Sequence, residues 1–296
     1  MSHRADAASL TPTPIATRRE VLATALAAGF ALAVRPVSAS TITTDDAGLV
    51  AGAVHVPARD GGTIPAYRAR PAARSASRRP APALLVVPEI FGVHEHIRDL
   101  CRRFAHAGYC AVAPELFVRQ GDVASLADVS EILAKVVSKV PDAQVFADLD
   151  DTLAWIGKGE GDPEHAAITG FCWGGRITWL YATQRPKLRA GVAWYGRLAG
   201  EPNALQPEHP IDVASHLTVP VLGLYGGKDQ GIPLDSVERM RAVLAGGRSG
   251  SEIVVYPDAG HAFNADYRPS YREDAARDGW SRALAWFAAH GVAPSA

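Results

Sequence analysis

The sequence predicts an α/β fold, in which helices cover both faces of a mostly parallel central sheet. Three observations carry this prediction. Short runs of apolar, often β-branched residues alternate with amphipathic segments along most of the chain. These runs are apolar at consecutive positions, a pattern typical of strands that are buried on both faces. The last amphipathic segment, 271–290, carries the apolar stripe of a helix that packs on such a sheet.

The chain before this alternating region predicts an N-terminal hairpin. Residues 49–56 and 63–68 have the composition of strands, and the turn-forming segment Arg59–Gly62 lies between them. A surface loop rich in Ser, Arg, Pro and Ala is expected over 71–82. The later segment 203–220 is rich in Pro and His, and we expect it to be irregular chain at the rim of a site.

The elements of the alternating region follow in chain order. Each predicted strand is a short apolar run bounded by turn residues, and these runs are 83–88, 109–113, 166–171, 190–195, 219–225 and 252–256. Each predicted helix has apolar residues three or four positions apart, and these segments are 95–107, 126–137, 143–156, 176–183, 234–245 and 271–290. These elements show no internal repeat and no sign of a second domain, so we expect residues 40–296 to form one domain.

Composition and charge narrow the class of protein. A chain of 296 residues with 48% hydrophobic residues is typical of a globular protein. The formal net charge of −1 argues against a nucleic acid or a stable membrane association, and we expect a monomer. Three cysteines are too few for a disulfide scaffold. Cys101 and Cys110 are interpreted as buried thiols, with a disulfide between them as the alternative.

Residues 1–39 have the pattern of an export signal. Arg18 and Arg19 precede an Ala-rich apolar run, 23–34, and Val37–Ala39 supplies the small residues that a signal peptidase reads. The run is too short to cross a hydrocarbon core of about 30 Å as a helix. The paired arginines favour export by the twin-arginine machinery. We therefore expect a periplasmic or secreted protein, with a cytosolic tail as the alternative.

A candidate nucleophile lies in the segment Gly170–Gly175. An apolar strand ends there in Gly-Phe-Cys-Trp-Gly-Gly, and a helix-compatible segment follows directly. This is the strand, sharp turn and helix of a nucleophile elbow, with Cys172 where serine is usual. Side chains at the flanking positions would clash where strand and helix meet, and the helix N-terminus favours a thiolate. A buried cysteine in a glycine-rich turn is the alternative.

Two further residues complete a catalytic triad. Asp229 and His261 each follow a predicted strand, and catalytic side chains belong on the loops at the carboxyl ends of such strands. Cys172, Asp229 and His261 follow the order nucleophile, acid, histidine, which is that of the α/β-hydrolase fold. His261 would accept the thiol proton and later activate water, and Asp229 would fix its tautomer.

The chain resembles the dienelactone hydrolase family (carboxymethylenebutenolidase-like α/β-hydrolases) over nearly all of 40–296. The resemblance rests on segments 88–92, 113–117, 170–175, 195–196, 227–229 and 260–263. It implies a triad of Cys172, Asp229 and His261. It also implies that Glu89 contacts the nucleophile and holds the thiol poorly reactive until substrate binds.

The position of Glu89 at the end of a buried strand also has chemical consequences. A carboxylate at the end of a buried strand is costly unless it is paired, and beside Cys172 it would disfavour the thiolate or take the thiol proton. A loop or helix-start carboxylate is the alternative interpretation. The backbone N–H groups of Ile90, in this loop, and of Trp173, in the elbow, would form an oxyanion hole.

Substrate recognition is the weakest part of the resemblance. The family holds an anionic substrate with two arginines, and Arg119 matches the first of them. Ala265 occupies the position of the second, and Arg268 lies three residues further on. The loss of one arginine removes charge-assisted hydrogen bonds. We therefore expect Arg119 to bind substrate, and we leave the identity of the ester or lactone open.

The sequence thus predicts a hydrolase that cleaves a small carboxylic ester or lactone through a thioester intermediate, without a cofactor. No metal is expected, because His94 and His96 lack the i, i+4 spacing of a zinc helix. One alternative is an exported binding protein without turnover on the same scaffold. Another is a class I amidotransferase-like cysteine enzyme, which pairs its cysteine with a closely spaced His-x-Glu; here Asp229 precedes His261 by many residues.

Overall fold

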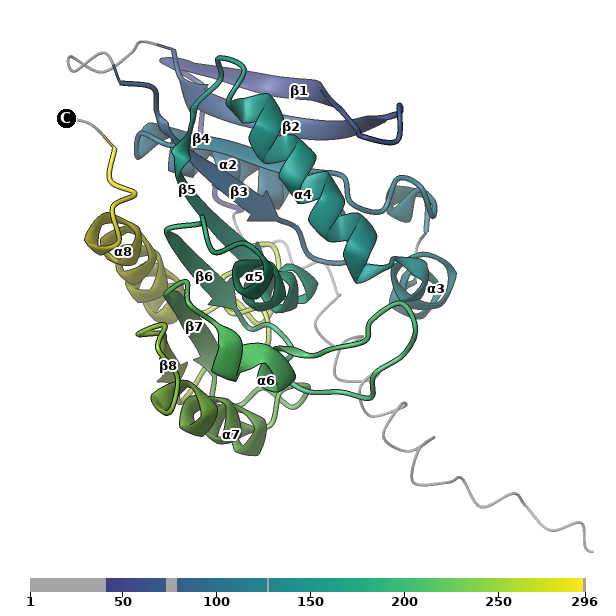
Figure 1. The fold of residues 1–296 in the computed structure, drawn as a ribbon, viewed down its shortest axis with the longest axis vertical. Coiled ribbons are helices and arrows are strands. Elements are labelled where there is room, and N and C mark those ends of the chain that lie inside the picture. The colour runs from purple at the N-terminus through teal and green to yellow at the C-terminus, as the bar shows by residue number, and fades with distance from the viewer. Residues whose placement is uncertain (1–40, 73–78, 127, 295–296) are drawn as a thin grey trace, which may run out of the picture.

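The centre of the molecule is an eight-stranded sheet (Figure 1). The structure is a computed structural model, and it describes residues 41–72, 79–126 and 128–294. The strand order is β1-β2-β4-β3-β5-β6-β7-β8. The pairs β1–β2 and β2–β4 are antiparallel, and the remaining neighbours are parallel. The strands are β1 (Leu49–Pro57), β2 (Thr63–Pro71), β3 (Pro82–Val87), β4 (Cys110–Pro114), β5 (Asp162–Phe171), β6 (Ala190–Trp194), β7 (Val221–Gly226) and β8 (Glu252–Tyr256).

Helices cover both faces of the sheet, as the alternating pattern predicts. They are α2 (Glu95–His106), α3 (Val129–Lys135), α4 (Asp142–Ile156), α5 (Trp173–Gln184), α6 (Pro210–Val213), α7 (Leu234–Ala245) and α8 (Glu273–Ala289). On one face α2 packs against α8, where the rings of Phe104 and Trp280 lie 4.4 Å apart. On the other, α4 and α5 lie side by side in front of the sheet (Figure 1), joined by a hydrogen bond from the hydroxyl of Tyr181 to Asp150. The predicted α/β fold is confirmed.

Several strands are buried along their whole length, which explains their runs of consecutive apolar residues in the sequence. Every residue of β3, β4, β6 and β7 is buried. A strand that contacts helices on both faces has no polar side, so its apolar residues are consecutive rather than alternating. The parallel strands therefore form a rigid frame, and the loops at their carboxyl ends meet along one edge of the sheet.

Several boundaries differ from those expected. The predicted helix 126–137 is interrupted at Val136, whose φ of −124° and ψ of −68° leave the helical region, and a 3-10 turn (Val137–Lys139) follows. Helix α5 begins at Trp173, three residues earlier than predicted, because its first turn accommodates two glycines. The segment 203–220 is mostly irregular, as expected, but contains α6 and a 3-10 turn, Ala214–His216.

The predicted export signal, 1–39, lies outside the described residues. No helix formed by the described residues has both the length and the apolar composition that a membrane crossing requires.

Candidate active site

Cys172 lies in the sharp turn between β5 and α5. Its backbone has φ 54° and ψ −111°, values that belong to neither a strand nor a helix. Its N–H donates to the carbonyl of Trp194 at 3.0 Å, and its own carbonyl accepts from the N–H of Gly175 at 3.0 Å. Cys172 is the N-cap of α5 and therefore lies at the positive end of the helix dipole.

Glycines make this turn possible. A Cβ on Gly170 would lie 2.1 Å from the carbonyl oxygen of Gly174, and a Cβ on Gly174 would lie 2.3 Å from the carbonyl oxygen of Val87. Both neighbours are backbone atoms of regular elements, α5 and β3, so no side chain fits at either position. The flanking glycines therefore serve the steric purpose that the sequence indicated.

Asp229 and His261 are hydrogen-bonded to each other. The distance between Oδ2 of Asp229 and Nδ1 of His261 is 2.7 Å. Oδ1 of Asp229 accepts from the backbone N–H groups of Gly231 and Ile232, at 2.9 and 3.1 Å. These bonds fix the carboxylate, and the carboxylate in turn fixes the orientation of the imidazole.

The charges around His261 favour its protonated form. Burial by itself disfavours the imidazolium, but the charges of Cys172 and Asp229 outweigh burial and raise the pKa of His261 to about 10. The imidazole is thus held in a setting that favours its cationic form.

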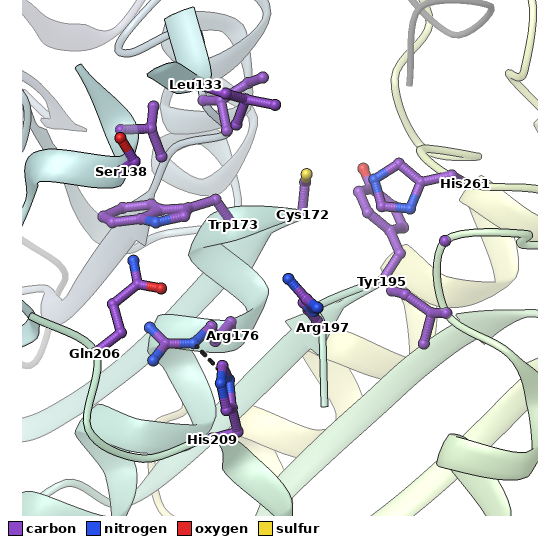
Figure 2. Close-up of a pocket in the computed structure, with 14 residues that line it drawn as sticks. Leu133, Ser138, Cys172, Trp173, Arg176, Tyr195, Arg197, Gln206, His209 and His261 are labelled. Carbon is purple, nitrogen blue, oxygen red and sulfur yellow. Dashed lines mark hydrogen bonds between the residues drawn. The ribbon is translucent and has the colours of Figure 1, made fainter. Parts of the chain in front are cut away.

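Cys172 and His261 face a common pocket (Figure 2), whose volume is about 390 Å³. One part of its wall is apolar and includes Ile90, Leu133 and Trp173. The remaining lining residues are Val137, Ser138, Arg176, Tyr195, Arg197, Gln206, His209, Gly231 and Ile232. The two predicted oxyanion-hole residues, Ile90 and Trp173, therefore lie at the same pocket as the thiol. Trp173 is the first residue of α5, so its N–H has no acceptor within the helix.

Glu89 is almost completely buried, with 1% of its surface exposed, in the loop after β3. Its Oε2 accepts a hydrogen bond from the hydroxyl of Tyr267 at 2.6 Å and lies 3.5 Å from Nε2 of His94 and 3.8 Å from Nη2 of Arg268. Burial favours the neutral acid, but Arg268 and the two histidines nearby outweigh it and lower the pKa of Glu89 well below its usual range. The predicted contact between Glu89 and Cys172 stays a prediction.

The histidines of the segment 94–96 have structural partners. His94 lies beside Glu89, and His96 lies with its Nδ1 3.2 Å from Oδ1 of Asp266. Glu95 points away and forms an ion pair with Arg102 at 2.6 Å. No group of three or more His, Cys, Asp or Glu residues is arranged around a common metal position in the described ranges.

The predicted substrate-binding residue Arg119 lies apart from the pocket. Its Nη1 donates to the buried carboxylate of Asp148 at 2.6 Å, and its Nε donates to Asp60 at 3.0 Å. It is not among the residues that line the pocket of Cys172. Arg268 does not line it either: its guanidinium is buried over the rings of Phe91 and Tyr267.

Two other arginines do line the pocket, and sequence reasoning missed both. Arg176 is neutralised by a bidentate pair with Asp142, with both distances 2.7 Å. Arg197 donates from Nε to the carbonyl of Ala199 at 2.9 Å, and it forms no ion pair with a carboxylate of the described residues. Its position directly after a strand end was the signal that could have identified it.

The other two cysteines are buried free thiols. Burial raises the pKa of Cys101 far above its usual range and that of Cys110 to about 12. Both are therefore unreactive as nucleophiles, in contrast to the placement of Cys172 at a pocket.

The family model of the dienelactone hydrolase family matches residues 64–291. A "putative carboxymethylenebutenolidase" of Methylorubrum extorquens is 57% identical over 291 residues, which cover 98% of each chain. A protein of the same description from Escherichia coli K12 is 52% identical over 270 residues, 91% of this chain and 98% of the other. A crystal structure of a "putative dienelactone hydrolase" from Klebsiella pneumoniae is 56% identical and superimposes with a TM-score of 0.78, covering 81% of this chain and 98% of the other.

Proposed function

This chain belongs to the dienelactone hydrolase family and is a carboxylic-ester hydrolase, and we propose that it works through a thioester on Cys172. The observation that supports this most is the hydrogen bond between Asp229 and His261 beside a pocket that also contains the thiol. The substrate is a small ester or lactone that fits a pocket of about 390 Å³. No cofactor takes part in the proposed reaction.

Acylation begins when Nε2 of His261 holds the proton of the thiol and the thiolate attacks the carbonyl carbon. The negative charge on the carbonyl oxygen is received by the N–H groups of Ile90 and Trp173. Each such donor contributes about 3 kcal/mol to transition-state stabilisation in measured enzymes. His261 then gives its proton to the departing alkoxide, and the acyl group remains on sulfur.

Deacylation uses the same histidine as a base. Once Cys172 is acylated, the thiolate charge that raises the pKa of His261 is gone, so this pKa falls and Nε2 can accept a proton from water. The water oxygen attacks the thioester carbonyl, the C–S bond breaks and the acid is released. Asp229 keeps Nδ1 protonated throughout.

Replacement of the nucleophile tests this proposal. Cys172→Ala is expected to lose hydrolysis of p-nitrophenyl acetate, and mass spectrometry of the wild-type protein is expected to detect an acetyl group on Cys172. Cys101→Ala, which removes a buried thiol away from the pocket, is the matched control and should keep both activity and adduct. Hydrolysis at the wild-type rate by Cys172→Ala would refute the mechanism.

We also propose that residues 1–39 direct export by the twin-arginine machinery and that the mature protein is a monomer. Replacement of Arg18 and Arg19 by lysine tests the first point. The protein should then stay in the cytoplasmic fraction, whereas unchanged distribution between fractions would contradict export by this route. Sedimentation of the mature protein tests the second point.

A further inference from the structure

Backbone strain is concentrated at the candidate active site. Within the described ranges, positive φ angles at non-glycine residues occur at Cys172 (54°), Tyr195 (38°) and Ala262 (59°). Each such residue costs about 1–3 kcal/mol, and the strain persists only where the surrounding structure imposes it. Cys172 is the proposed nucleophile and Ala262 directly follows His261. Tyr195 is the third strained residue, and the mechanism above gives it no role.

The backbone of Tyr195 is held against the nucleophile elbow. Its N–H donates to the carbonyl of Leu224 at 2.8 Å, which continues the pairing between β6 and β7. The next residue, Gly196, packs so closely on the first turn of α5 that a Cβ there would lie 2.3 Å from the carbonyl carbon of Gly175. The strained turn therefore delivers the phenol of Tyr195 into the pocket of Cys172 (Figure 2).

The side chain of Tyr195 is fully buried, yet its hydroxyl has no hydrogen-bond partner among the described residues. Its ring lies edge-on to the imidazole of His261, with 5.3 Å between the ring centres, and contacts Phe263 in the same way at 5.2 Å. A buried donor without an acceptor costs about 1–3 kcal/mol. Phenylalanine would make the same ring contacts without this cost, so the hydroxyl itself needs an explanation.

Glu89, in the loop after β3, supplies a buried acceptor without a hydrogen bond. Oε2 of Glu89 is engaged by Tyr267, but Oε1 is buried with no hydrogen bond. Burial, and then the charge of Glu89, raise the pKa of Tyr195 well above its usual value, with Tyr267 and Cys172 adding to the effect. The phenol therefore keeps its proton for donation, and it lines the same pocket as the thiol of Cys172.

We propose that the hydroxyl of Tyr195 and Oε1 of Glu89 together hold the water molecule that hydrolyses the thioester. A buried water needs two to four polar partners, and three are present here during deacylation. The water accepts from the hydroxyl of Tyr195, donates one proton to Oε1 of Glu89 and donates the other to Nε2 of His261. Its remaining lone pair is then directed at the thioester carbonyl.

The step is balanced in atoms and charge. The new C–O bond forms as the second water proton moves to Nε2 of His261, and the tetrahedral intermediate then expels the sulfur of Cys172. Neither Tyr195 nor Glu89 changes its protonation state. Both act by orienting the nucleophilic water, and a misplacement of about 1 Å in such a step costs up to about 100-fold in rate.

This inference rests on the proposed thioester mechanism, and it predicts a defect in deacylation alone. In Tyr195→Phe, the rate of p-nitrophenol release in the first turnover should stay near that of the wild type, whereas the steady-state rate should fall about 10- to 100-fold. KM should fall with kcat, because the acyl-enzyme accumulates. Hydroxylamine, which attacks thioesters without an activated water, should restore turnover. Glu89→Gln is the second variant: because it weakens the acceptor, its steady-state rate should fall relative to its own first-turnover rate.

Tyr181→Phe is the matched control, because its buried hydroxyl donates to Asp150 on α4 and does not reach the pocket. Its ratio of first-turnover rate to steady-state rate should equal that of the wild type. An unchanged ratio in Tyr195→Phe and Glu89→Gln, or a parallel loss of both rates, would overturn the water site and assign Tyr195 a packing role. Absence of any acyl group on Cys172 in the wild type would instead refute the thioester mechanism itself.

Discussion

Asp229 and His261 are 32 residues apart in the sequence, and their side chains form a hydrogen bond of 2.7 Å. The strands that precede them, β7 and β8, are parallel neighbours, so the loops at their carboxyl ends emerge side by side. The backbone N–H groups of Gly231 and Ile232 occupy the second oxygen of Asp229. The carboxylate is thus fixed before any substrate binds, and the imidazole is oriented with it.

Asp229→Asn is therefore expected to reverse the tautomer of His261. The amide oxygen would keep the bonds to Gly231 and Ile232, and its NH₂ group would then donate to Nδ1, which places the proton on Nε2. A histidine in that state cannot act as a base, and we expect kcat for p-nitrophenyl acetate to fall by about 10⁴. Asp258→Asn, an exposed aspartate paired with Lys228, is the control. A loss below tenfold in Asp229→Asn would contradict this account of the pair.

The raised pKa of His261 predicts how stability depends on pH. In the unfolded chain this pKa is about 6.5, and in the folded protein it is about 10. Below pH 6.5 both states carry the proton, and the stabilising contribution of the charged histidine is fully present. Between these two values the folded state binds more protons, so the contribution decreases as the pH rises and is lost above about 10.

Urea unfolding at several pH values checks this dependence. The difference in free energy of unfolding between the wild type and His261→Gln should shrink steadily from pH 6 to pH 10. In a Cys172→Ala background the decrease should be weaker, because one of the two charges that raise the pKa is gone. A difference that grows with pH would show that His261 is not held as a cation.

Much of this arrangement could be predicted from sequence because it depends on local patterns. Consecutive apolar residues identified the buried strands, and the glycines around Cys172 identified the turn. Contacts that join distant segments could not be predicted in this way. Tyr267 reaches Glu89 across 178 residues, and Arg119 is paired with Asp148 and Asp60 rather than with the pocket. Asp229 and His261 could be paired because each follows a strand in a known order, whereas no motif or periodicity marks these other pairings.

The buried pair of Glu89 and Arg268 should be strongly coupled. Both side chains are almost fully buried, and removal of one partner leaves an uncompensated charge, which typically costs about 3–5 kcal/mol. We expect Arg268→Met to lower the free energy of unfolding by this amount at neutral pH. Glu89→Gln combined with Arg268→Met should recover part of the loss, since no buried charge is then unpaired. Urea unfolding of the four proteins gives the coupling energy, and strictly additive losses would contradict it.

Arg197 is the pocket arginine whose charge is available to a substrate. Arg176 is neutralised by Asp142, whereas Arg197 forms no ion pair with a described carboxylate. A charge-assisted hydrogen bond contributes about 1.5–3 kcal/mol. Arg197→Gln should therefore raise KM about 10- to 100-fold for a p-nitrophenyl ester that carries a carboxylate at the far end of its acyl chain. KM for a neutral ester of equal length should not change.

Arg119→Gln is the matched comparison for Arg197→Gln, because the sequence resemblance assigns substrate binding to Arg119. Its removal leaves the buried carboxylate of Asp148 without its partner, so we expect lower stability with KM unchanged for both esters. In the opposite result, KM for the charged ester would rise in Arg119→Gln and stay constant in Arg197→Gln. That result would require Arg119 to leave Asp148 and enter the pocket when substrate binds. The pair of variants thus distinguishes recognition by a residue that already lines the pocket from recognition that needs a rearrangement.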